Sequence, residues 1–127
     1  MTTDITASQA FDILSSSPQS FLIDTRSREE WRKNGYPLFE NKVLLISSHL
    51  MPDMLANPQF LRLLQEKCKN MDASMIFMCR SSTRSRIAAD IAEAAGYKNC
   101  FVVSDGFAGS QFGPGWKNSN LPIAEKL

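Results

Sequence analysis

A cysteine follows directly after a short apolar run, and a polar loop rich in arginine follows the cysteine. The run SMIFM at 74–78 predicts a buried strand that ends just before Cys79, and a helix is expected after the loop. Ligands bind at the carboxyl ends of strands in parallel α/β sheets, and the first turn of the following helix leaves N–H groups unpaired. These donors and the helix dipole favour an anion. We therefore expect Cys79 to be an accessible, nucleophilic thiolate.

The arginines near this cysteine support the same interpretation. Arg80, Arg84 and Arg86 fall within seven residues, and no Asp or Glu occurs between Cys79 and Asp90. A cation near a helix N-terminus opposes the helix dipole at a cost of about 0.3–1 kcal/mol. Such a cluster is therefore typical of a site where a bound anion makes the interaction favourable. Two plainer alternatives stay open: arginines that point into water, and a cysteine that is a buried core thiol.

The surrounding segments alternate between strand-like and helix-like patterns. The strand-like runs are apolar on both faces, as strands are when helices cover both sides of a sheet. The pattern predicts an α/β domain with a mostly parallel sheet of about four to five strands and helices on both faces. Strands are expected at 21–24, 43–47, 74–78 and 101–103.

Helix signals stand between these runs. Capping boxes at 6–9 and 27–30 predict two helix starts, and Ile5 is expected to staple the first. Asn57 and Pro58 predict an N-cap followed by a first helical position.

Two further helices are expected in the second half of the chain. Apolar residues at helical spacing predict a helix that ends at Gly96. Residues 106–115 hold four of the six glycines and should form a loop, and 116–127 should form one short helix. The apolar face of the helix before Gly96 is expected to comprise Ile87, Ala88, Ile91, Ala92 and Ala95.

Length and charge limit the class of protein. The 127 residues suit one domain over 1–127, because a domain holds about 150 residues. A hydrophobic content of 43% is enough for a core. The net charge of +1 argues against a nucleic-acid or membrane-surface binder, and no apolar run reaches the ~18–20 residues of a membrane span. The N-terminus lacks the basic, apolar pattern of a leader, so we expect a cytoplasmic protein.

The cysteines and the histidine give no metal signature. Cys68, Cys79 and Cys100 have spacings that match no zinc motif, and we expect free thiols and no metal site. Cys68 and Cys100 are expected to be core thiols. The lone His49 is expected in a loop, and Trp31 in the core.

Three motifs resemble one family. CRSSTRS at 79–85 resembles the active-site loop of rhodanese-like sulfurtransferases, commonly written CRSGxRS. DTRSREEW at 24–31 resembles the family's D-x-R-x-x-x-E-W segment, and Gly35 and Pro37 fall near its following GHIPGA stretch. GWKNSNLP at 115–122 resembles the GWxxxGLP ending of single-domain members. The matches occur in the family's order, and they imply a rhodanese-like fold.

The resemblance implies transfer of sulfane sulfur. Cys79 would attack the outer sulfur of an anionic donor, thiosulfate or a persulfide, and a thiol or cyanide would then remove that sulfur from Cys79. Backbone N–H groups of the loop would hold the persulfide. The resemblance implies no cofactor, and a partner protein's persulfide is a further candidate donor. The substrate-binding residues that it implies are Arg80, Ser81, Ser82, Thr83 and Arg84.

The sequence departs from the family pattern in two places, and two other functions stay open. Ser82 stands where the family usually has glycine, and a positive φ there would cost about 1 kcal/mol. GYPLFENK at 35–42 replaces GHIPGA. Non-catalytic interaction or regulatory modules share the fold, although they usually lack the cysteine. Phosphatases and arsenate reductases of related fold use C-x5-R, whereas Ser85 stands six positions after Cys79.

Two charged residues follow the first predicted strand. Asp24 and Arg26 should face the same edge of the sheet as Cys79. They could support the pocket, or Arg26 could form a structural ion pair with Asp24 or Glu30. The structural pair is the preferred interpretation.

Overall fold

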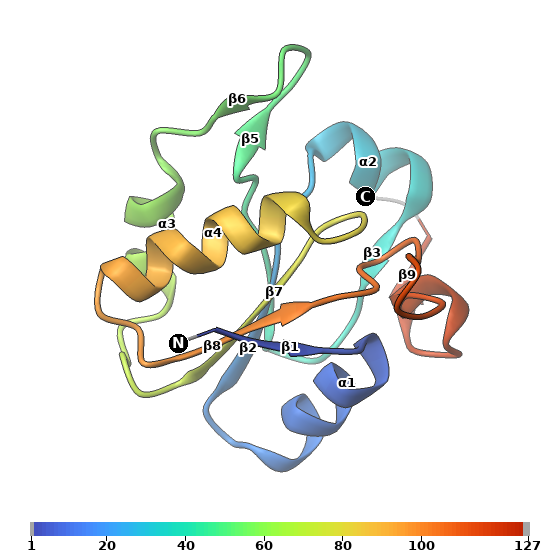
Figure 1. The fold of residues 1–127 in the computed structure, drawn as a ribbon, viewed down its shortest axis with the longest axis horizontal. Coiled ribbons are helices and arrows are strands. Elements are labelled where there is room, and N and C mark those ends of the chain that lie inside the picture. The colour runs from blue at the N-terminus through green and yellow to red at the C-terminus, as the bar shows by residue number, and fades with distance from the viewer. Residues whose placement is uncertain (1, 126–127) are drawn as a thin grey trace.

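A five-stranded parallel sheet forms the centre of the molecule (Figure 1). The computed structural model describes residues 2–125, and neighbouring strands run parallel in the order β1-β8-β7-β2-β4. This arrangement confirms the predicted α/β class. The strands are β1 (Thr2–Ile5), β2 (Ser20–Asp24), β4 (Val43–Leu45), β7 (Ser74–Met78) and β8 (Asn99–Val103).

The strand β1 is absent from the sequence prediction. It lies at an edge of the sheet and pairs with β8, so its residues need not be apolar on both faces. Ile5, expected to staple the first helix, is the last residue of this strand and is buried in the same core cluster as Ala10 of that helix. The strand β4 is shorter than predicted and ends at Leu45.

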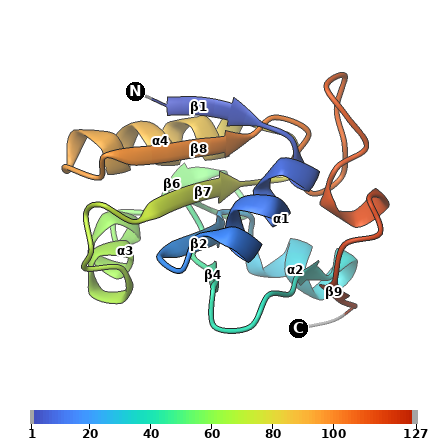
Figure 2. The same cartoon turned by 90° about the horizontal axis from the view of Figure 1, so that it is seen from below.

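Helices cover both faces of the sheet, as predicted (Figure 2). The helix α1 (Ala7–Ser16) packs on one face through Ala10 and Leu14. The helices α3 (Phe60–Lys67) and α4 (Thr83–Ala94) pack on the other face. The short helix α2 (Arg28–Asn34) lies near the end of the sheet to which the strands point.

The two capping boxes are confirmed. Thr6 and Ser27 each accept a hydrogen bond from the third residue of the helix that follows, and the side chain of that residue accepts one in return. The predicted start of α3 is wrong. That helix begins at Phe60, and the Asn57 side chain instead accepts a hydrogen bond from Gln59 N in the turn before it.

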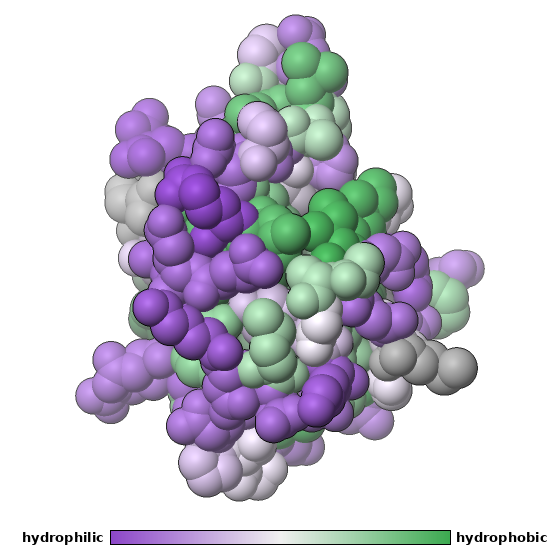
Figure 3. Space-filling model, turned by 90° about the vertical axis from the view of Figure 1, so that its left-hand side faces the viewer, coloured by the Kyte–Doolittle hydropathy of each residue, from purple (hydrophilic) through white to green (hydrophobic). Residues whose placement is uncertain are grey.

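The buried face of α4 differs from the prediction. Ala88 and Ala92 are buried as expected, and Ala89 joins them, whereas Ile87 is 43% and Ile91 37% exposed. The buried face of the helix is thus made of small side chains, Ser85 and the three alanines, and both isoleucines lie on the neighbouring, exposed face. Figure 3 shows the side of the molecule with α3, α4 and the β5–β6 turn, where green apolar side chains lie among purple ones.

Short elements complete the chain. A two-stranded sheet joins β3 (Tyr36–Pro37) to β9 (Ile123–Ala124), and another joins β5 (His49–Leu50) to β6 (Leu55–Ala56). His49 therefore lies in a short strand rather than in a loop. The helix predicted over 116–127 is wrong for the described residues, because a 3₁₀ turn (Trp116–Asn118) and β9 occupy this segment and 126–127 lie outside them. Residues 106–115 form a loop, as predicted.

The parallel topology brings the ends of the central strands together. Cys79 follows β7, and Asp24 ends β2, which is the neighbour of β7. Thr25 N donates to Met78 O, so these two strand ends stay connected. Among the described residues, no helix has the length and apolar character needed to cross a membrane.

Candidate functional site at Cys79

The main chain of Cys79 is held between two neighbouring segments. Its carbonyl oxygen accepts a hydrogen bond of 2.8 Å from Phe107 N, in the loop after β8. The carbonyl oxygen of the next residue, Arg80, accepts one of 3.0 Å from Ala108 N. The start of the polar loop is therefore fixed against residues 106–108, which belong to the glycine-rich loop.

The Cys79 sulfur lies at the N-terminal end of α4. Ser85 N donates a hydrogen bond of 3.4 Å to Cys79 Sγ, and Ser85 Oγ lies 3.4 Å from the same sulfur. Cys79 is only 1% exposed, which contradicts the expectation of an accessible thiolate. A donor can reach the sulfur only if the residues around it shift.

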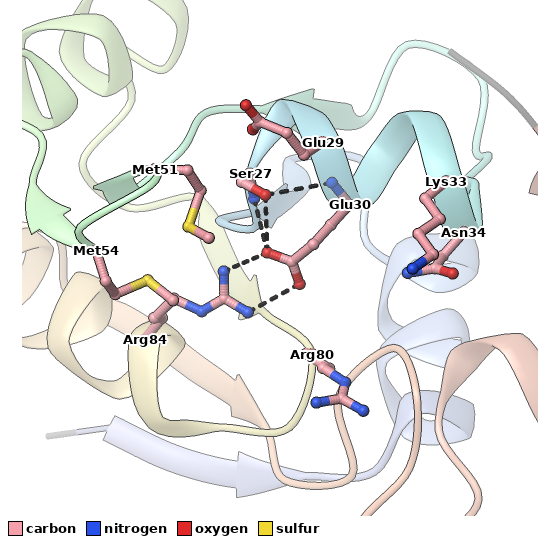
Figure 4. Close-up of a pocket in the computed structure, with 9 residues that line it drawn as sticks. All are labelled: Ser27, Glu29, Glu30, Lys33, Asn34, Met51, Met54, Arg80 and Arg84. Atoms are coloured by element: carbon pink, nitrogen blue, oxygen red, sulfur yellow. Dashed lines mark hydrogen bonds and ion pairs between the residues drawn. The ribbon is translucent and has the colours of Figure 1, made fainter.

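Arg84, the last of the predicted substrate-binding residues, is held by a carboxylate. Its two terminal nitrogens donate to both oxygens of Glu30, at 2.6 and 3.0 Å (Figure 4). The hydrogen bonds with Glu30 and the negative charge of that carboxylate favour the charged guanidinium and raise the pKa of Arg84, although burial opposes this.

Glu30 belongs to the site, although its position in the sequence does not identify it as a site residue. Burial would raise the pKa of its carboxyl, but hydrogen bonds from Arg84 and Ser27, together with the Arg84 charge, outweigh burial and lower it to about 2. The sequence signal for Glu30 is the capping box, because the same side chain accepts a hydrogen bond from Ser27 N. One carboxylate therefore caps α2 and positions Arg84.

We expect Glu30→Gln to weaken the fold at neutral pH by about 2 kcal/mol and to reduce its sensitivity to acid. The pKa of Glu30 is lowered on folding, so its stabilisation is present above pH 4.5 and is lost as pH falls towards pH 2. Urea unfolding of both proteins at pH 7 and pH 3 measures the difference. Glu29→Gln, at the exposed neighbouring position, is the matched control; equal losses in the two variants would contradict the assignment.

Arg26 forms a buried ion pair with Asp24. Arg26 Nη2 lies 2.9 Å from Asp24 Oδ2 and 2.8 Å from Gly35 O, and the guanidinium carbon lies 3.8 Å from the centroid of the Phe107 ring. Asp24 is fully buried, and Arg26 is 1% exposed. The preferred sequence interpretation was a structural pair with Asp24 or Glu30, and the structure shows the pair with Asp24. Arg26 also lines a pocket beside the loop.

The other two arginines of the cluster have different surroundings. Arg86 forms an ion pair of 2.8 Å with Asp4 of β1, and 43% of its side chain is exposed. Arg80 is exposed, and Figure 4 shows it without a dashed line to any other residue drawn. Within residues 2–125, Arg80 is the member of this cluster that has no carboxylate partner.

The loop between Cys79 and α4 adopts a backbone that serine tolerates. Ser82, the N-cap of α4, has a φ of −158°, so the positive φ considered for this position does not occur. Ser81 and Thr83 are exposed, and Thr83 is the first residue of α4. Gly106 does have a positive φ of +59°, and a Cβ there would clash with the carbonyl oxygens of Arg80 and Ser81. This glycine permits the close approach of the two loops.

A fully buried carboxylate anchors the glycine-rich loop. Asp105 Oδ1 accepts a hydrogen bond of 2.8 Å from Ala7 N at the start of α1, and its Oδ2 accepts one of 2.9 Å from Gly115 N. Asp105 thus connects the first helix with the end of this loop.

Two pockets flank Arg80. The larger, of about 500 Å³, is bounded by α2, by Met51 and Met54 in the β5–β6 turn, and by Arg80 and Arg84 (Figure 4). The smaller, of about 230 Å³, is bounded by Arg26, Glu30, Arg80, Phe107, Ala108, Lys117 and two asparagines. Cys79 itself is not among the residues that line either pocket.

The remaining thiols are part of the core. Cys68 and Cys100 are buried, as predicted, and burial raises the pKa of each to about 11. Trp31 is buried as expected. In the described part of the chain, no group of three or more His, Cys, Asp or Glu side chains is placed to hold a metal ion.

The fold defines the class of protein. A rhodanese-like domain protein from Staphylococcus aureus superposes with a TM-score of 0.66 over 96% of this chain and 98% of its own, at 20% identity. The homodimeric polysulfide-sulfur transferase from Wolinella succinogenes superposes with a TM-score of 0.76 over 97% of this chain and 78% of its own, at 18% identity. The fold is therefore rhodanese-like.

Family membership follows from sequence as well as structure. The chain belongs to the family described as the STR4 middle domain, whose model matches residues 3–126. An uncharacterised protein from Rickettsia conorii is 42% identical over 121 residues, which cover 94% of each chain. The Rv0390 structure from Mycobacterium tuberculosis is 33% identical, with a TM-score of 0.84 and 97% of each chain covered.

Proposed function

We propose that the protein is a sulfurtransferase that moves sulfane sulfur from an anionic donor, thiosulfate or a persulfide, to a thiophilic acceptor. Cys79 is the nucleophile, and the reaction takes place in the cytoplasm without a cofactor. The observation that carries the proposal is the position of the Cys79 sulfur, 3.4 Å from Ser85 N at the start of α4. The likeness to the fold of a polysulfide-sulfur transferase supports the same chemistry.

The reaction has two displacement steps. The Cys79 thiolate attacks the outer sulfur of thiosulfate, the S–S bond breaks, and sulfite leaves with the bonding electron pair. The product is a persulfide on Cys79. A thiolate or cyanide then attacks the outer sulfur of this persulfide, and Cys79 leaves as a thiolate, ready for another turnover.

The residues around the sulfur have separate roles in this proposal. The N–H of Ser85 and the dipole of α4 stabilise negative charge on the cysteine, before attack and after sulfite leaves. Arg84, fixed by Glu30, adds positive charge to the same region. Arg80, which has no carboxylate partner in the described chain, attracts the anionic donor. Ser81, Ser82 and Thr83 contribute main-chain N–H groups of the loop that holds the persulfide.

Mass spectrometry after incubation with thiosulfate tests the proposal. We expect the intact mass to increase by one sulfur atom, the added sulfur to map to the peptide that contains Cys79, and cyanide to remove it. The peptides that contain Cys68 and Cys100 are internal controls, because both thiols are buried and their pKa is raised. If all of the protein keeps its unmodified mass after incubation with thiosulfate, the proposal is wrong.

A non-catalytic interaction or regulatory module is the second candidate. The 1% exposure of Cys79 favours it, because a nucleophile must be reached by its substrate. The same mass measurement separates the two functions, since a module leaves the thiol unreacted. Faster turnover of an aryl phosphate than of thiosulfate would instead support the phosphatase alternative.

A further inference from the structure

The β5–β6 hairpin exposes apolar side chains that the chain's own fold leaves uncovered. Leu50, Met51, Met54 and Leu55 are between 42% and 65% exposed. The hairpin has two strands of two residues each, and Figure 1 shows it projecting beyond the central sheet. A two-stranded hairpin is only marginally stable in water unless it packs against other structure. A surface that covers these side chains would therefore stabilise the hairpin.

The helix α4 adds two apolar side chains to the same side of the molecule. Arg84, Ile87 and Ile91 are three and four residues apart, so they lie along one side of the helix. Arg84 lines the large pocket together with Met51 and Met54, which places the start of this helix side next to the hairpin. Figure 3 shows apolar side chains over the hairpin and α4 on one side of the molecule. The exposed apolar side chains here form what we call the hairpin patch: Leu50, Met51, Met54, Leu55, Ile87 and Ile91.

The size of the hairpin patch matches one half of a dimer interface. A fully exposed side chain of this kind presents roughly 150–200 Å², so the patch exposes on the order of 500 Å² of apolar surface. A standard interface buries about 800 Å² on each partner, and in homodimers about 65% of this area is apolar. Each copy must therefore contribute about 500 Å² of apolar surface, which the hairpin patch supplies.

The charges near the hairpin patch favour a partner of low net charge. Arg84 is paired with Glu30, and Arg62 of α3, on the same side of the molecule, is paired with Glu66. A strongly acidic or basic partner gains little from side chains whose charge is already neutralised. This chain has a net charge of only +1, so two copies repel each other weakly. A second copy therefore fits both the apolar character and the charge of this side.

We propose that the hairpin patch is the contact surface of a symmetric dimer of this chain. A two-fold dimer buries the same surface on both copies, so one patch of suitable size and composition is sufficient. The inference does not depend on sulfur transfer, because none of the six residues takes part in the proposed reaction. Met51 and Met54 also line the pocket beside Arg84, so the second copy lies at the edge of that pocket.

Sedimentation velocity of the natural protein tests the inference. The measurement is made at concentrations about a hundredfold apart in the micromolar range, because the dimer fraction follows mass action. We expect a species with the mass of two chains, and its fraction should rise with concentration. A protein that remains monomeric throughout contradicts the inference, and the hairpin patch would then require a different protein as its partner.

Substitutions on two separate elements show whether the hairpin patch forms the contact. Leu55→Asp on β6 and Ile87→Asp on α4 each place a carboxylate in the apolar contact, and each should raise the dimer dissociation constant at least about tenfold. Both positions are exposed in the single chain, so unfolding in urea should change little. Phe112→Asp, at a 59% exposed position in the glycine-rich loop, is the matched control and should leave the dissociation constant unchanged. Dimers that persist in both patch variants, or that weaken equally in the control, would place the contact elsewhere.

Methionine methyl resonances locate the contact without any substitution. In protein labelled at the methionine methyl groups, the NMR signals of Met51 and Met54 should shift as the concentration is raised, because these side chains enter the contact. Met75 and Met78 are fully buried in the core and are the internal controls. If a dimer forms while the signals of Met51 and Met54 stay unchanged, another surface makes the contact and the inference is wrong.

Discussion

Replacing Asp24 by alanine is expected to lower the free energy of unfolding by about 3–5 kcal/mol, because it leaves a buried guanidinium without its counter-charge. Arg26 is 1% exposed, and Asp24 is its carboxylate partner. The bond to Gly35 O and the contact with the Phe107 ring remain, but neither supplies negative charge. Urea unfolding at pH 7 measures the loss.

Two further variants show whether the buried charge is the cause. Asp24→Ala combined with Arg26→Met removes both charges and should recover a large part of the lost stability. Asp72→Ala breaks an ion pair with Lys98 whose side chains are more than 70% exposed, and should cost less than about 1 kcal/mol. A loss in Asp24→Ala as small as in Asp72→Ala would show that Arg26 does not need its partner.

Replacing Cys79 by serine is expected to lower sulfur transfer at least a thousandfold, to about the background rate, because a hydroxyl forms no persulfide. The measurement is thiocyanate formation from thiosulfate and cyanide. Serine is close to cysteine in shape and can keep the contact with Ser85 N. Unfolding in urea should therefore remain close to that of the natural protein, which separates lost chemistry from lost structure.

Cys100→Ala is the matched control for this variant. It also removes a buried thiol, but one at the start of β8 and far in sequence from the arginine loop. Its transfer rate should stay near that of the natural protein. Transfer by Cys79→Ser at the rate of this control would exclude Cys79 as the nucleophile.

The sequence predicts those parts of the fold that local patterns determine. Central strands such as β7 are apolar on both faces, so their limits follow from composition. The capping box beginning at Ser27 identifies its helix because the signal lies within four residues. The edge strand β1 could not be found in this way, since its pairing with β8 depends on segments almost a hundred residues apart.

The loop of the candidate site can be predicted from the sequence, but the carboxylates that pair with its arginines cannot. The order of strand, Cys79 and arginines places the sulfur at the end of the sheet. The carboxylates that pair with these arginines come from other segments, Glu30 from α2 and Asp4 from β1, and no spacing rule connects them. The surroundings of Cys79 are also a tertiary property, because Phe107 and Ala108, which bond to the main chain of Cys79 and Arg80, come from beyond β8.

The two hydrogen bonds to Asp105 bear on how the pocket wall is assembled during folding. The carboxylate joins Ala7, near the beginning of the chain, to Gly115, near its end. Contacts between such distant positions carry a large loop-closure entropy and tend to form late. A nascent chain that ends before Gly115 would therefore contain every strand of the central sheet but an unfinished binding wall, and competence for ligands would arise only with the last contacts to form.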